Sequence, residues 1–145
     1  MCRRRLAAFA AGLVLALVTA LSATASPRLQ VGLYEEAQTL FGNPDTTFPV
    51  LQQLRVQTLR VTLYWYRVAR FQPTEPANPA SLEYDWDLYD RTALYAQQFG
   101  IRLVVSIYGT PEWANGGKGV TYAPLKTTSL RAFSLAAARR RQGLF

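Results

Sequence analysis

Aromatic, carboxylate and amide side chains follow each of three strand-like segments of this chain. They are Glu35, Glu36, Trp65, Tyr66, Tyr108, Glu112, Trp113 and Asn115. The 145-residue chain has no histidine and a single cysteine, Cys2. Acid or base chemistry at these positions would therefore use carboxylates, and serine triads and thiolate catalysis are not expected. Flat rings beside hydrogen-bonding groups suit a sugar ring, because its C–H faces stack on aromatic rings and its hydroxyls bond at their edges.

Strand-like and helix-like segments alternate along the chain and would position these side chains. The patterns of apolar residues predict strands at residues 29–34, 58–65 and 101–108, and helices at about 45–56, 85–99 and 128–141. Asp45 or a following threonine is expected to cap the first helix, and Gly100 to end the second. The proline-rich residues 67–82 and the residues 112–124 are expected to form irregular loops. This order predicts an α/β protein with a parallel sheet.

The predicted strands differ in the faces that they present. The second strand alternates between an apolar and a more polar set of side chains, which are Leu59, Val61 and Leu63 against Arg60, Thr62 and Tyr64. The third strand, residues 101–108, is apolar almost throughout, which is typical of a strand buried on both faces. A Rossmann sheet is the alternative to a barrel. It is less favoured because the turn after the first strand lacks the G-x-G-x-x-G phosphate-binding pattern.

Two segments resemble a known family. The runs LRVTLYW at residues 59–65 and YDWDLYDRTALYAQQFGIRLVVSIYGTPEWANGG at residues 84–117 are similar to the N-terminal part of secreted bacterial glycoside hydrolases. These enzymes belong to the (β/α)8 clan that contains cellulases and xylosidases. The resemblance covers about residues 31–139. It implies that the chain forms the N-terminal βαβαβα portion of a TIM barrel and acts on O-glycosidic bonds of polysaccharides or oligosaccharides without a cofactor.

The same resemblance suggests substrate-binding residues. Arg60 matches the strand-two arginine that supports the nucleophilic carboxylate in the family, although an inward-facing arginine paired with any carboxylate would look the same. Trp113 and Asn115 match the loop after strand three, which lines a sugar subsite; alternatively, Trp113 simply packs this loop. Trp65 and Tyr108 fall at strand ends, where they would be sugar platforms or part of the barrel core.

The resemblance places both catalytic carboxylates outside this chain. In the family, the acid/base is the glutamate of an Asn-Glu-Pro-like motif after strand four, and the nucleophile is a glutamate after strand seven. The sequence contains no Asn-Glu pair, and a complete barrel takes about 250 residues. We therefore expect a glycosidase fragment that is inactive alone, with no catalytic residue and no metal site, produced by a frameshift or premature stop near Arg140.

Several alternatives remain open at this point. The chain could be a genuine small protein, a non-catalytic carbohydrate-binding or interaction module, or an α/β domain of unrelated purpose. A partial barrel would leave sheet edges unpaired, so self-association through these edges is a further expectation.

The first 25 residues predict a secretory signal peptide. A basic start, an apolar run at residues 6–21 and Ala23-Thr24-Ala25 follow in the order that such peptides require, with cleavage after Ala25. A membrane anchor is less favoured, because about 16 apolar residues fall short of the roughly 20 that span a bilayer. We expect a secreted domain, residues 26–145, without stable membrane association. Loss of the three leading arginines lowers the net charge from +7 to +4, and no basic patch for nucleic acid remains.

Overall fold

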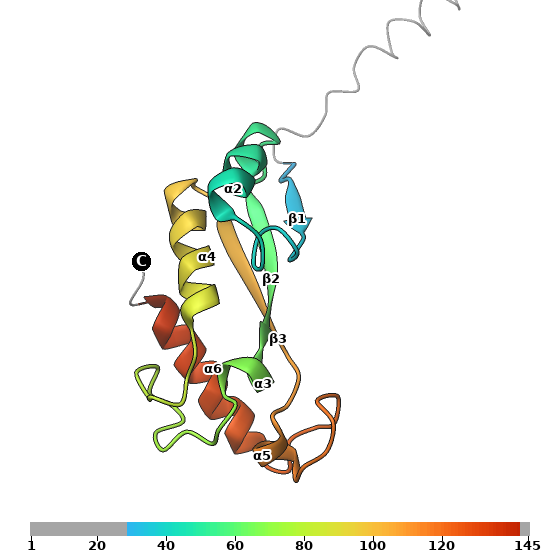
Figure 1. Ribbon diagram of the computed structural model, residues 1–145, viewed down its shortest axis with the longest axis vertical. Helices are drawn as coiled ribbons and strands as arrows, with labels where there is room; N and C mark the ends of the chain where they lie inside the picture. The colour runs from blue at the N-terminus through green and yellow to red at the C-terminus, as the bar shows by residue number, and fades with distance from the viewer. Residues whose placement is uncertain (1–28, 143–145) are drawn as a thin grey trace, which may run out of the picture.

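The computed structural model describes residues 29–142, and the side chains of residues 29–140. It is a mixed α/β structure around one parallel three-stranded sheet with strand order β1-β2-β3 (Figure 1). The elements are β1 (Gly32–Tyr34), α2 (Pro44–Gln53), β2 (Thr58–Tyr64), α3 (Trp65–Val68), α4 (Asp87–Gln98), β3 (Arg102–Tyr108), α5 (Glu112–Asn115) and α6 (Thr127–Gln142). The predicted α/β class and parallel strands are thus confirmed. The predicted signal peptide lies outside the described residues.

The strands pair over very different lengths. β1 contributes three residues, from Gly32 opposite Thr58 to Tyr34 opposite Arg60, whereas all seven residues of β2 pair with β3. Past the end of β1, side chains complete the edge of β2. Glu36 accepts a hydrogen bond from the backbone N–H of Thr62 at 2.6 Å. The Tyr89 hydroxyl donates to the Thr62 carbonyl at 3.2 Å and accepts from the Tyr64 N–H at 3.0 Å.

Helices α2 and α4 cover one face of the sheet toward the amino ends of its strands (Figure 1). The alternation of β2 places Leu59 and Val61 on this face, where Phe48 and Leu51 of α2 and Ala93 of α4 bury them. The period of two that was expected for β2 is therefore confirmed. The burial of these apolar side chains stabilises the packing of α2 and α4 on the sheet.

The boundaries of α2 correct the predicted capping residue. Asn43, and not Asp45 or a following threonine, caps the helix: its side chain accepts the backbone N–H of Asp45 at 3.0 Å. The helix ends at Gln53, before the predicted Val56, because Arg55 takes a left-handed conformation with φ of 56°. The end of α4 agrees with the prediction, since Gly100 adopts φ of 66° directly after the last turn.

A second core lies at the carboxyl ends of the strands on the same face. Phe133 and Ala136 of α6 pack there against Leu63, Trp65 and Trp86. The Phe133 ring stacks with the two indoles, at centroid distances of 5.3 Å to Trp65 and 5.8 Å to Trp86. This aromatic cluster is the main attachment of α6 to the sheet.

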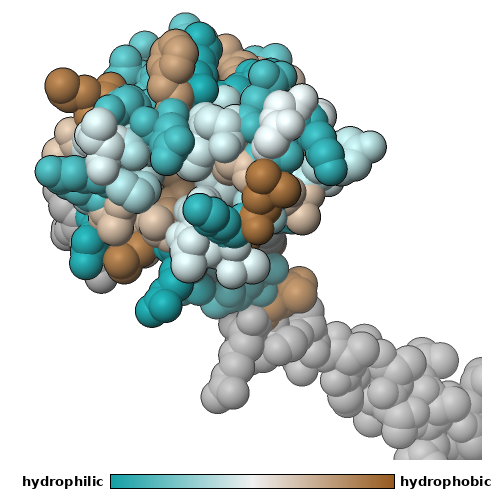
Figure 2. Space-filling model, turned by 90° about the horizontal axis from the view of Figure 1, so that it is seen from below, coloured by the Kyte–Doolittle hydropathy of each residue, from teal (hydrophilic) through white to brown (hydrophobic). Residues whose placement is uncertain are grey.

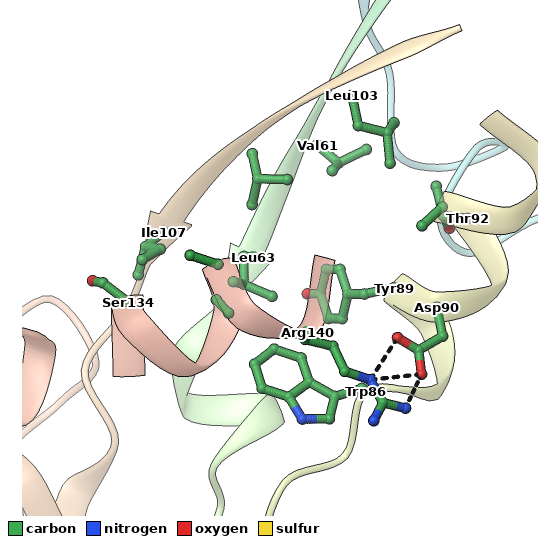
Figure 3. A pocket seen from close by; sticks show the side chains of 14 residues that line it. Val61, Leu63, Trp86, Tyr89, Asp90, Thr92, Leu103, Ile107, Ser134 and Arg140 are labelled. Atoms are coloured by element: carbon green, nitrogen blue, oxygen red, sulfur yellow. Dashed lines mark hydrogen bonds and ion pairs between the residues drawn. The ribbon is translucent and has the colours of Figure 1, made fainter. Parts of the chain in front are cut away.

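An ion pair adds a second attachment for α6. The guanidinium of Arg140, near the end of this helix, hydrogen-bonds with both carboxylate oxygens of Asp90 in the first turn of α4, with its Nε at 3.1 and 3.2 Å from them. Between these two attachments, Val105 and Ile107 of β3 remain more than one third exposed, whereas Val61 and Leu63 of β2 are buried. Figure 3 shows the pocket between the sheet, α4 and α6 that these side chains line.

Two expectations about β3 and the loops are wrong. The third strand is not buried on both faces: Val104, Val105 and Ile107 are each more than one third exposed. The reason is that α6 covers the sheet only near Leu63 and that β3 has no neighbour on its outer side within residues 29–142. The loops are not fully irregular either, because they begin with the short helices α3 and α5.

Candidate functional site

The second face of the sheet carries no helix in the described part of the chain. Its side chains come from the even-numbered residues of all three strands, and we call this surface the open face; it consists of Tyr34, Arg60, Thr62, Tyr64, Val104, Ser106 and Tyr108. Tyr34 and Tyr108 expose 56% and 47% of their surface. The open face therefore combines accessible aromatic rings with hydroxyl and guanidinium groups.

Arg60 lies at the centre of the open face. Its guanidinium carbon lies 4.9 Å from the centre of the Tyr34 ring, and its Nε donates a hydrogen bond to the Ser106 hydroxyl at 3.0 Å. The Tyr34 hydroxyl in turn lies 3.2 Å from the Thr62 hydroxyl oxygen. Among the described residues, no carboxylate forms an ion pair with Arg60. The terminal N–H groups of the guanidinium are thus available to a bound acceptor.

Glu36 and Tyr64 form a hydrogen-bonded pair at the carboxyl end of β2. The Tyr64 hydroxyl donates to one oxygen of Glu36 at 2.6 Å, and the Thr62 N–H donates to the other. Partial burial acts to raise the pKa of Glu36, but these hydrogen bonds and the charge of Arg60 outweigh it and lower that pKa. The same hydrogen bond, with burial, raises the pKa of Tyr64 to about 12. The carboxylate therefore stays ionised and engaged, and is a poor proton donor near neutral pH.

Arg67 stands beside this pair in a group of aromatic rings. Its guanidinium carbon lies 5.1 Å from the ring centre of Tyr64, 5.6 Å from that of Phe41 and 5.7 Å from that of Tyr66. Its Nε also donates to the Tyr66 hydroxyl at 3.2 Å. Such cation–π contacts orient the guanidinium without neutralising it, so a second exposed positive charge borders the open face.

Tyr108 extends the aromatic surface to β3. Its ring meets the Tyr64 ring edge to face at a centroid distance of 6.1 Å. Figure 2 shows the molecule from the end at which the strands finish, as a mainly hydrophilic surface with isolated hydrophobic residues. Of the five predicted substrate-binding residues, only Arg60 and Tyr108 are brought together on the open face.

The two predicted tryptophans lie on the other side of the sheet. Trp65 is buried, stacked on Phe133 within the second core. Trp113 packs edge to face against Trp65 at 5.8 Å, and its indole N–H donates to the Ala69 carbonyl at 2.8 Å. These placements correspond to the packing alternatives that the sequence left open. The odd or even position of a residue along β2 decides which face its side chain joins. Trp65 continues the odd-numbered series Leu59, Val61 and Leu63, which faces the helices, so its position in the sequence also indicates that it packs in the core.

Asn115 is fully buried and organises its own loop. Its side-chain amide donates to the carbonyls of Gly119 and Thr110 at 3.1 and 3.5 Å, and its oxygen accepts the N–H of Lys118 at 2.9 Å. All of these partners belong to the loop after β3. A buried amide with this set of bonds has no surface to offer to a sugar, so its predicted substrate contact does not agree with its position.

The remaining rim carboxylates have structural partners or stand apart. Glu35 accepts the backbone N–H groups of Gln38 at 3.0 Å and Thr39 at 3.2 Å, and so caps the turn that follows β1. Glu112 lies exposed in the first turn of α5. Within residues 29–142, no group of three acidic, histidine or cysteine side chains could hold a metal ion. The open face is therefore arranged for hydrogen bonding and ring stacking.

Several residues of the open face were not predicted. Tyr34 and Ser106 were not singled out from the sequence, although Tyr64 was placed on the same face as Arg60. All three belong to the open face because side chains two residues apart along a strand share a face. Arg60 and Tyr108 have the same parity, so the signal was present in the sequence once the strands were placed. The contribution of Glu36 had no such signal, because it depends on β1 being only three residues long.

Comparison of the sequence with models of known protein families finds no match, and neither does comparison with curated proteins. No helix in residues 29–142 is long and apolar enough to cross a membrane.

Proposed function

We propose that this chain is part of a secreted glycoside hydrolase of the (β/α)8 type and that its open face binds saccharide. The observation that carries the proposal is the arrangement of Arg60, Ser106, Tyr34 and Tyr108 on one accessible face of a parallel sheet. Half-exposed phenol rings offer stacking surfaces for the C–H faces of a sugar. The guanidinium and the hydroxyl groups between them offer hydrogen bonds to the sugar hydroxyls.

Catalysis is not part of the proposed activity of this chain. Hydrolysis of a glycosidic bond by a retaining enzyme uses two carboxyl groups about 5 to 5.5 Å apart, one of which must donate a proton. Beside the open face, Glu36 has a lowered pKa and accepts hydrogen bonds from Tyr64 and from the backbone of Thr62. We therefore propose that the described residues bind saccharide without turnover and without a cofactor.

A second candidate is a carbohydrate-binding or interaction module that never had a catalytic pair. It is favoured by the same engagement of Glu36, since that carboxylate completes the edge of β2 as a structural element. Both candidates predict saccharide binding at the same residues, and they differ only in whether a catalytic half exists elsewhere.

The experiment is a titration of the protein with soluble β-linked oligosaccharides, followed by calorimetry or ligand-observed NMR, together with an assay for released reducing sugar. We expect binding without hydrolysis. Tyr108→Ala should weaken binding about tenfold, which corresponds to the loss of about 1.4 kcal/mol and is within the range of an aromatic stacking contact. Tyr34→Ala should act in the same direction.

The matched control is Leu54→Ala. Leu54 is also exposed but follows α2, at the opposite end of the strands, so the control should bind as the original chain does. Absence of binding to every β-linked saccharide tested would reject the proposal. Release of reducing sugar by this chain would reject the view that it is inactive alone.

A further inference from the structure

Arg67 is held in place by neutral groups. It belongs to α3, directly after β2, and its side chain is exposed. The rings of Phe41, Tyr64 and Tyr66 surround its guanidinium, with their centres 5.1 to 5.7 Å from the guanidinium carbon. Its Nε donates a hydrogen bond to the Tyr66 hydroxyl at 3.2 Å. These contacts restrict the orientation of the guanidinium and leave its positive charge in place.

The rings around Arg67 support one another. The Tyr64 ring lies 6.4 Å from the Phe41 ring and meets the Tyr66 ring edge to face at 5.9 Å. Tyr66 also packs against Gly109, where a Cβ would lie 2.5 Å from its ring. Phe41 follows β1, Tyr66 follows β2 and Gly109 follows β3, so the segments after all three strands build the surroundings of Arg67. In a parallel barrel the loops after the strands form the binding site, and the position of Arg67 agrees with that architecture.

No carboxylate among residues 29–140 neutralises Arg67. No ion pair in this part of the chain involves it. Glu36 accepts hydrogen bonds from the Tyr64 hydroxyl with one oxygen and from the backbone N–H of Thr62 with the other. The Nε of Arg67 has its partner in Tyr66, whereas its two terminal nitrogens make no hydrogen bond within the described residues. An oriented guanidinium with both terminal nitrogens open is a receptor for the two oxygens of an anion.

We infer that the open face takes an acidic saccharide and that Arg67 binds the carboxylate of a uronic acid unit through its two terminal nitrogens. The inference rests on the proposed saccharide binding and names the class of saccharide. A carboxylate is planar and matches the fork of a guanidinium with two parallel hydrogen bonds. A uronic acid carries this group at the edge of its ring, so its C–H face stays free to stack on an aromatic side chain.

The stacking ring and the charge lie close together. Arg67 and Tyr108 contact the same side chain, since the guanidinium carbon lies 5.1 Å and the Tyr108 ring centre 6.1 Å from the centre of the Tyr64 ring. A short saccharide that stacks on Tyr108 therefore reaches Arg67 with its carboxylate. Arg60 is less suited to this carboxylate, because the negative charge of Glu36 already acts on it. Its role is hydrogen bonding to sugar hydroxyls.

Calorimetric titration with a matched pair of ligands tests the preference for charge. One ligand is a β-linked trisaccharide with glucuronic acid at its non-reducing end, and the other is the same trisaccharide with the carboxyl group reduced to a hydroxymethyl group. We expect the acidic ligand to bind about tenfold more tightly at low salt, because hydrogen bonds between charged groups are the stronger ones. This preference should fall as the ionic strength rises from about 0.01 to 1 M, where the screening length decreases from about 30 to 3 Å.

Variants assign the preference to one arginine. Arg67→Gln should lower the affinity for the acidic ligand about tenfold, to that of the reduced ligand. Arg67→Lys keeps the charge without the planar fork and should retain part of the preference. Arg60→Gln should weaken both ligands alike. The matched control is Arg55→Gln, which removes the same charge from an exposed arginine directly after α2, at the amino ends of the strands, and should keep the preference.

Four results would overturn the inference. They are equal binding of the acidic and the reduced ligand by the original chain, an equal loss of preference in Arg67→Gln and Arg55→Gln, a preference lost in Arg60→Gln but kept in Arg67→Gln, and tighter binding of a sulfated trisaccharide than of the acidic one. Equal binding of both ligands would reject this inference alone, whereas binding of neither would also reject the proposed saccharide binding. If circular dichroism shows that Arg67→Gln fails to fold, the ligand pair on the original chain and Arg67→Lys still decide.

Discussion

Removal of the Phe133 ring should release α6 from the sheet. Phe133 is only 1% exposed and stacks with Trp65 and Trp86 in the second core. Truncation of a buried phenylalanine to alanine lowers the free energy of unfolding by about 3 to 5 kcal/mol. This figure already includes the loss of the two stacking contacts. The total free energy of unfolding of a small domain is about 5 to 15 kcal/mol. Phe133→Ala should therefore remove about a fifth or more of the stability.

Denaturant unfolding followed by tryptophan emission is suited to this change. The chain has three tryptophans, Trp65, Trp86 and Trp113, and all of them belong to or pack against the second core. We expect a lower unfolding midpoint and an emission shifted to longer wavelength before unfolding, because the indoles gain contact with water. Circular dichroism should show that α2 and α4, which lie in the first core, are retained.

The control for Phe133→Ala is Leu135→Ala on the same helix. Leu135 is partly exposed, and its truncation should cost less than about 1 kcal/mol. Equal free energies of unfolding for the two variants would contradict the placement of α6. An unchanged emission maximum in Phe133→Ala would contradict the stacking on which the prediction rests.

Two further predictions concern the loop after β3 and the hydrogen bond at the end of β2. Gly109 has φ of 76°, and a Cβ there would lie 2.5 Å from the Tyr66 ring, whereas a Cβ at Gly100 would meet nothing within 4 Å. Gly100→Ala should lower the free energy of unfolding by about 1 to 2 kcal/mol because of its left-handed backbone alone, and Gly109→Ala should lower it further, as thermal denaturation would show. Equal losses in the two variants would refute the clash. Absorbance titration should find Tyr64 ionising near pH 12 and Glu36→Gln returning it toward 10. Folding raises the pKa of Tyr64, so the hydrogen bond from Tyr64 to Glu36 contributes stability that is fully present below about pH 10 and is lost as the pH rises through about 12.

The sequence predicted the parts of the fold that depend on periodicity. The alternation along β2 correctly divided Leu59 and Val61 from Arg60, and Gly100 correctly marked the end of α4. The helices α3 and α5 were missed because four residues are too short to show a helical period. The cap at Asn43 was missed because Asp45 and the neighbouring threonines are equally good capping residues by type.

The candidate site was predicted only in part, for a different physical reason. Residue type indicates which side chains could bind a sugar, but the parity of the strand decides which of them reach the open face. Trp65 has the right type and the wrong parity, so it joined the second core. Asn115 lies beyond the strands, where neither periodicity nor parity applies, and only the loop carbonyls around it determine its role.

The separation of the two faces makes the proposed binding experiment interpretable. Both cores lie on the helix-covered face of the sheet, whereas Arg60 and Tyr108 lie on the open face. Tyr108 is half-exposed and makes an edge contact with Tyr64, so its truncation should change the free energy of unfolding by well under the cost of losing Phe133. A loss of saccharide binding in Tyr108→Ala with unchanged unfolding would therefore report on the site. If that variant unfolds instead, the open face contributes to the core and its assignment as a binding surface fails.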